Sequence, residues 1–182
     1  LWSADLKAGL VMYPSEIAVK FYPVEGTKND QFYAMDAQKG KLAIASGRLN
    51  DNLPGFTRNG VHFFEEGSWS LLNVKQVTAW PESDTWDFID VAINPNNTDE
   101  VAMATYSYRP LTLMNATDTM VFDGANSPIK PTSIGNGWTL VSDVLFDNRG
   151  NLWALNGYSD RPLTVRDKTG NWYAFDCGSD GK

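Results

Sequence analysis

The feature that most constrains the fold is an internal repeat, marked by one short phrase that occurs twice. The stretch SYRPLTL at residues 107–113 returns as SDRPLTV at residues 159–165. The surrounding segments, 90–124 and 143–178, align along their length, with small insertions confined to turns. Self-similarity at a period of about fifty residues indicates that one supersecondary unit is used several times.

Weaker copies lie upstream. The pieces MDAQKGKLAIASG (35–47) and NGVHFFEEGSWSLLN (59–73) form a third copy interrupted by a long polar loop, and the opening LWSADLKAGLVMY (1–13) resembles part of a fourth. In the complete copies, four short apolar runs are separated by turn signals such as NPNNTDE, DNRGN and DKTGN. Sustained helical periodicity is missing from every window of the sequence.

Four strands repeated at this period are typical of β-propeller blades, so we predict an all-β chain of four-stranded antiparallel blades. A β-sandwich with accidental similarity is the alternative, but it leaves the matching positions of Pro110 and Pro162 unexplained. We divide the single propeller region, residues 1–182, into a partial blade at 1–34 and complete blades at 35–80, 86–130 and 138–178.

The start of the chain aligns with the second strand of a blade rather than with the first. We therefore expect a fragment of a longer protein, in which the remainder of the propeller covers the outer blade faces. In isolation such a fragment would be an open arc, and its exposed apolar faces and strand edges would favour self-association.

Alternating apolar positions predict which side chains pack between blades. These are Val91, Ile93 and Val101 in one copy and Val144, Phe146, Leu152 and Trp153 in the next. We expect most of the tryptophans to belong to this core because each buries a large apolar area.

Composition and charge exclude several classes of function. A net charge of −7 argues against binding to nucleic acid, and no apolar run reaches the roughly 18 residues that insertion into a membrane requires. The single cysteine, Cys177, has no partner for an intrachain disulfide, and the single histidine, His62, cannot form a multi-histidine metal site. We expect no cofactor and no metal, and we expect a plain turn with Gly150 at positive φ in DNRGN.

Candidate ligand-binding residues lie in the loops between second and third strands, which gather on one face of a propeller around its channel. These loops supply Arg48 in the first complete copy, Tyr106, Tyr108 and Arg109 in the second, and Tyr158, Asp160 and Arg161 in the third. Aromatic rings beside guanidinium groups suit carboxylated or phosphorylated sugars. The alternative is that Arg109 and Arg161 only brace the turn before proline.

The phrase DNRGNLWALN resembles the D-x-x-G-N-L-W repeat of the two-component regulator propeller class. The longer blades, with FDGANSPIKP after a fourth strand, are similar to the N-terminal propeller region of PorZ-type proteins of the type IX secretion system. This resemblance spans essentially the whole chain. It implies a non-enzymatic accessory that binds anionic lipopolysaccharide, in the periplasm or at the outer-membrane surface of a Gram-negative bacterium. It carries no specific binding residues onto this sequence.

The sequence leaves three functions open, because a fold does not fix a function. The first is a binding module of an envelope protein, which recognises a glycan, a lipopolysaccharide or a partner protein through the channel face. The second is the periplasmic sensor region of a hybrid two-component receptor, where ligand binding biases a signalling dimer. The third is a hydrolase or lyase, which would need a carboxylate pair about 5–10 Å apart on neighbouring loops. We favour them in this order.

Overall fold

The computed structural model describes residues 2–5, 9–15, 18–22, 26–134 and 136–176. All regular secondary structure in these ranges is β-strand, which confirms the predicted all-β class. The strands are β1 (Trp2–Asp5), β2 (Gly9–Ser15), β3 (Ala18–Tyr22), β4 (Ala34–Gln38), β5 (Lys41–Ala45), β6 (Leu49–Asn50), β7 (Leu53–Pro54), β8 (Val61–Glu65), β9 (Ser68–Leu72), β10 (Phe88–Ile93), β11 (Val101–Ser107), β12 (Leu111–Met114), β13 (Thr119–Phe122), β14 (Thr139–Phe146), β15 (Leu152–Gly157), β16 (Leu163–Arg166) and β17 (Trp172–Phe175). Within the same ranges, no helix has the length and apolarity to cross a membrane. Cys177 lies outside them.

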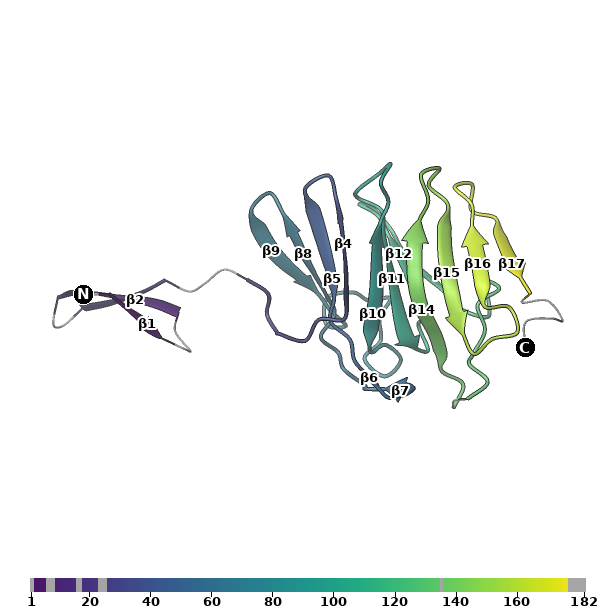
Figure 1. The fold of residues 1–182 in the computed structure, drawn as a ribbon, viewed down its shortest axis with the longest axis horizontal. Coiled ribbons are helices and arrows are strands. Elements are labelled where there is room, and N and C mark those ends of the chain that lie inside the picture. Colours follow the sequence, from purple (N-terminus) through teal and green to yellow (C-terminus); the bar gives the residue numbers. More distant parts are fainter. Residues whose placement is uncertain (1, 6–8, 16–17, 23–25, 135, 177–182) are drawn as a thin grey trace.

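Most strands belong to three antiparallel groups, which lie side by side in Figure 1. The first group contains β4, β5, β8 and β9, the second contains β10 to β13, and the third contains β14 to β17. A short ladder between β11 and β14 joins the second group to the third. The remaining strands form a sheet of β1, β2 and β3 and a small hairpin of β6 and β7. Apart from Ala34, the strands of the three groups fall within the predicted blade ranges, while the division into blades stays a prediction.

The first and second groups pack face to face through apolar side chains. The buried cluster takes Ala43, Ala45, Val61 and Phe63 from the first group and Val91, Ile93, Val101 and Met103 from the second. The rings of Trp80 and Phe88 complete it, with centroids 4.7 Å apart. The indole Nε1 of Trp80 donates a hydrogen bond to Thr112 Oγ1 at 2.8 Å, so this buried polar atom is satisfied.

The opposite face of the second group packs on the third group. This cluster contains Ala92, Ala102, Ala104, Leu111, Leu113 and Phe122 from the second group and Val141, Val144, Leu152 and Ala154 from the third. Successive side chains of a strand point to opposite faces of a sheet. The second group is therefore apolar on both faces, as expected for a sheet held between two others.

The first strand of each group is tied to the first strand of the next by an aspartate. Asp36 on β4 accepts a hydrogen bond from the Ile93 N–H at 2.8 Å. Asp90 on β10 accepts one from the Val144 N–H at 2.7 Å. These two ties help to fix how far one group is shifted against its neighbour.

The predicted inter-blade core is only partly right. The side chains of Val91, Ile93, Val101, Val144 and Leu152 are buried as predicted. The prediction is wrong for Trp153, which is half-buried because it alternates with Leu152 and lies on the other face of the third group. There its ring stacks on Phe175, with a centroid distance of 6.2 Å. Phe146 is also half-buried, at the edge of the second cluster.

The outer face of the third group is apolar and exposed within the described part of the chain. It includes Leu145 and Leu155, whose exposed fractions are 53% and 42%. Together with Trp153 and Leu163, these side chains border a cavity of about 160 Å³. This face is apolar like the faces through which the first and second groups pack on their neighbours.

We predict that Leu152→Ala lowers the free energy of unfolding by about 2–5 kcal/mol, because it leaves a cavity in the second cluster. Trp153→Ala should cost less, in spite of the larger side chain removed, because that ring is half-exposed. Urea denaturation of both variants would measure the difference. A larger loss for Trp153→Ala than for Leu152→Ala would show that the core lies on the other face.

Candidate functional site

The repeated phrase forms the same turn in both groups. At the end of the second strand, the Thr105 N–H donates to the Pro110 carbonyl at 2.8 Å, and the Asn156 N–H donates to the Pro162 carbonyl at 2.7 Å. Within each turn, a serine hydroxyl accepts from the arginine N–H that precedes proline, at 3.0 Å in the second group and 3.2 Å in the third. Proline lacks an N–H and fits the position where no donor is needed. The phrase therefore recurs for a structural reason.

Both arginines of this turn are engaged by carboxylates. Arg109 lies 3.6 Å from Asp84 and 3.7 Å from Asp123, and Arg161 lies 2.9 Å from Asp176. Asp123 and Asp176 each follow the fourth strand of their group, so the two ion pairs are equivalent. An anionic ligand would have to compete with these carboxylates, and the geometry favours the alternative in which the arginines brace the turn.

The other predicted residues are placed in different surroundings. The side chain of Tyr106 is fully buried, so it does not offer a binding surface. Tyr108 and Tyr158 are exposed, and so is Arg48 in the loop between β5 and β6. Asp160 accepts hydrogen bonds from Lys130 Nζ at 3.3 Å. The exposed tyrosines remain available for binding, and their role stays a prediction.

An aromatic patch, Phe56, Trp86, Tyr108 and Trp138, lies where these loops meet. The ring of Trp86 is 5.4 Å from Phe56, 5.5 Å from Tyr108 and 6.4 Å from Trp138, as measured between centroids. Trp86 is buried, whereas Phe56 and Tyr108 are exposed at 47% and 42%. Sequence reasoning found only Tyr108. The signal that could have found the tryptophans is their position just before β10 and β14.

A buried carboxylate holds the exposed ring of Phe56 in place. Asp87 accepts hydrogen bonds from the Phe56 N–H at 2.8 Å, the Thr57 N–H at 2.9 Å and Thr57 Oγ1 at 2.7 Å. Both Phe56 and Asp87 have positive φ, at 56° and 48°. Non-glycine residues seldom adopt this conformation, and the surrounding hydrogen bonds must hold them there. The loop is thus preorganised from its buried side.

The first strands of the three groups line a polar cavity of about 310 Å³. It contains Asp36, Asp90 and Asp143. Burial raises the pKa of Asp90 to about 6; the N–H groups of Val144 and Val91 oppose this shift, and the neighbouring Asp143 adds to it. Within the described ranges, no group of three or more His, Cys, Asp or Glu side chains is arranged to hold a metal ion.

The DNRGN segment is a plain turn, as predicted. Gly150 has a φ of 82°, and its N–H donates to the Asp147 carbonyl at 3.0 Å. The Asp147 carboxylate is occupied by donors from the protein: the N–H groups of Arg149 and Asn151, the Asn151 amide and the indole of Trp153. Desolvation works against ionisation, but these hydrogen bonds outweigh it and lower the pKa of Asp147 to about 2.

Asp90 should make stability depend on pH. Its folded pKa of about 6 lies above the value of about 3.9 for an unfolded aspartate. The contribution of Asp90 to the free energy of unfolding is therefore complete below about pH 4 and is lost as the pH rises through 6. The free energy of unfolding of Asp90→Asn minus that of the wild type should rise by about 1–2 kcal/mol between pH 4 and pH 7, because only the wild type loses stability as Asp90 ionises. Urea denaturation at both pH values measures this, with the exposed Asp30→Asn as control. A pH-independent difference would contradict it.

Removing the acceptor under the loop should be costly. We expect Asp87→Ala to lower the free energy of unfolding by about 2–4 kcal/mol, because three donors lose their partner. Asp87→Asn should lose less, since one oxygen can still accept. Thermal and urea denaturation would rank the two variants, and a loss below about 1 kcal/mol for Asp87→Ala would argue against the anchoring role.

No protein-family profile matches the chain, and no curated protein matches it either. Among solved structures it is similar to PorZ, an essential bacterial surface component of the type IX secretion system of human oral-microbiomic Porphyromonas gingivalis. The TM-score is 0.73 at 24% identity, and the match covers 93% of this chain and 23% of the PorZ chain. Another similar structure is XC5397 of Xanthomonas campestris, a gluconolactonase, with a TM-score of 0.48 at 12% identity over 93% of this chain and 55% of that one.

The PorZ similarity is informative about the fold, and the gluconolactonase similarity is too weak to inform the chemistry of this chain. The chain spans less than a quarter of the length of PorZ. Repeated four-stranded antiparallel groups that pack face to face agree with that match. The chain therefore has a β-propeller fold related to that of PorZ.

Proposed function

We propose that the chain is a non-enzymatic interaction module of a bacterial cell-surface protein, and that it contacts a partner protein through the aromatic patch. The observation that carries this proposal is the pair of exposed rings, Phe56 and Tyr108, that both pack against the buried Trp86. Aromatic residues are enriched in protein interfaces and dominate their binding energy. Because Asp87 anchors the loop of Phe56, little conformational entropy would be lost on binding.

A partner protein suits this surface better than an anionic glycan or lipopolysaccharide. Arg109 and Arg161 are already paired with carboxylates, and the chain has a net charge of −7. Both features oppose binding of a strongly anionic molecule. The similarity to PorZ supports a cell-surface location and a role in type IX secretion, as proposals for the longer protein of which this chain would be a part.

The non-enzymatic part of the proposal is supported by the hydrogen bonds of the titratable side chains, which are made with other groups of the protein. His62 is buried, with Nδ1 3.0 Å from Ser46 Oγ and Nε2 accepting from the Lys28 N–H at 3.0 Å. Burial, with a contribution from Lys28, lowers the pKa of this histidine. In the polar cavity lined by the first strands, Asp36 and Asp90 accept the hydrogen bonds that tie neighbouring groups together. These groups have structural partners and are poorly placed to act on a substrate.

Another contact surface is the outer face of the third group, which would be covered in a complete propeller. We propose that the remainder of the propeller covers Leu145, Trp153 and Leu155. An isolated chain would then self-associate through this face, because exposed apolar patches drive association.

Site-specific photocrosslinking tests the partner proposal. Tyr108 would be replaced by p-benzoylphenylalanine in the protein expressed in its own host, with the exposed Tyr33 replaced as the control. We expect a discrete protein adduct from position 108 only, and Phe56→Ala should reduce its yield at least about fivefold. A lipopolysaccharide adduct in place of a protein adduct would favour the anionic glycan. Equal labelling from both positions, or none, would refute the proposed surface.

A further inference from the structure

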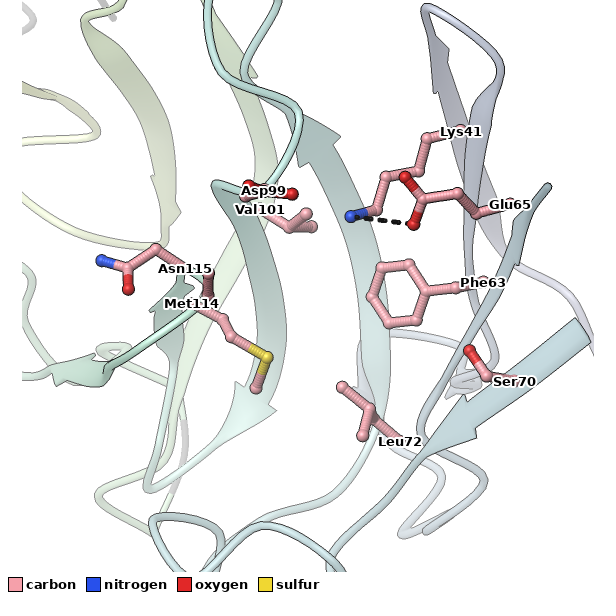
Figure 2. A pocket seen from close by; sticks show the side chains of 10 residues that line it. Lys41, Phe63, Glu65, Ser70, Leu72, Asp99, Val101, Met114 and Asn115 are labelled. Carbon is pink, nitrogen blue, oxygen red and sulfur yellow. Dashed lines mark ion pairs between the residues drawn. The ribbon is translucent and has the colours of Figure 1, made fainter.

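A cleft of about 270 Å³ opens between the first and second groups, away from the aromatic patch. Figure 2 shows its two walls. Phe63, Ser70 and Leu72 come from the first group, and Val101 and Met114 come from the second. The floor and walls are mostly apolar, while the rim carries Lys41, Glu65, Asp99 and Asn115.

The equivalent place between the second and third groups is filled by protein. There the ring of Trp172 packs edge-on against Phe122 at 5.1 Å, and the guanidinium of Arg166 lies 5.3 Å from the centre of the same ring. Met120 packs against the same cluster. One interface is thus closed by an aromatic ring at the position where the other is open.

The strand registers show which residues make this difference. Phe63 pairs with Ser70, and the equivalent Leu113 pairs with Met120, so Ser70 stands where the second interface has methionine. The same registers place Leu72 where the second interface has Phe122, and Met114 where it has Arg166. Thr119 corresponds to Trp172, because Thr119 pairs with Met114 and Trp172 pairs with the equivalent Arg166. Phe63 is larger than Leu113 and recovers only part of the lost volume.

The rim is polar and of mixed charge. Lys41 Nζ lies 3.5 Å from Glu65 and 5.8 Å from the centre of the Phe63 ring, and the lysine side chain is only 12% exposed. Asp99 and Asn115 line the cleft from the second group, and Asp99 lies across from this pair in Figure 2. Such a rim offers donors and acceptors to a main chain, and its one cation and two carboxylates do not favour a strongly anionic ligand.

We propose that this cleft binds an aromatic side chain of a partner polypeptide, in the place that Trp172 fills in the second interface. The volume lies below the roughly 300–1,000 Å³ of pockets that enclose drug-sized ligands, and it suits one side chain whose main chain runs along the rim. This site is separate from the aromatic patch, so it does not depend on the proposed function. It adds a second contact surface with its own chemistry.

The test uses N-acetyltryptophanamide as the probe and N-acetylleucinamide as the aliphatic control. Binding would be followed by NMR of ¹³C-methyl-methionine protein, in which the Met114 methyl group reports on the cleft and the buried Met103 serves as reference. We expect the tryptophan amide to shift the Met114 signal at millimolar concentration, and the leucine amide to bind at least about tenfold more weakly.

Two variants restore the side chains of the filled interface. Ser70→Met and Thr119→Trp should each weaken probe binding at least about tenfold, and Ser70→Met should raise the melting temperature because it fills a cavity. Ser133→Met, at an exposed loop position, is the matched control and should bind the probe as the wild type does. No shift of Met114, equal binding of the two amides, or full binding by both filled variants would each overturn the proposal. Phe56→Ala should leave probe binding unchanged, which separates this test from that of the aromatic patch.

Discussion

The structure depends on one packing requirement: each four-stranded group has to cover both of its faces with neighbouring groups. Alanines on the inner strands, among them Ala43, Ala92 and Ala102, make this possible because small side chains let adjacent sheets approach closely. That approach brings the carboxylates of Asp36 and Asp90 within reach of main-chain N–H groups in the next group. Apolar contact and these hydrogen bonds between groups thus reinforce the same arrangement.

The repeated turns serve this requirement rather than function. The serine, arginine and proline of SYRPLTL and SDRPLTV form one hydrogen-bonding pattern, and each arginine reaches an aspartate beyond the fourth strand. The aspartates of DNRGN and DKTGN accept several donors from their own turns. Residues that recur at the same place in two copies therefore have a shared structural task, and their recurrence is a poor guide to a binding site.

The fold could be predicted from the sequence because the repeat, the turn residues and the alternation of apolar positions all favour the same architecture. The face on which a side chain lies was less predictable. Trp153 looked like core on account of its size, yet its strand position directs it outward, and strand parity decides. The patch around Trp86 was missed because its four members come from four separate loops, and their proximity depends on tertiary packing.

The positions at which the copies differ give this chain surfaces that the repeat alone would not produce. A position that keeps its residue type in each copy preserves the common interface, whereas a position that changes size alters the surface locally. Ser70, in place of Met120, lines a cleft between two groups, and Thr119 stands where the second interface has Trp172. Leu145, Trp153 and Leu155, in place of three alanines, make the outer face of the third group bulkier than its counterpart. Whatever packs on that face must therefore offer smaller side chains than the third group offers to the second, because the space between adjacent sheets is limited.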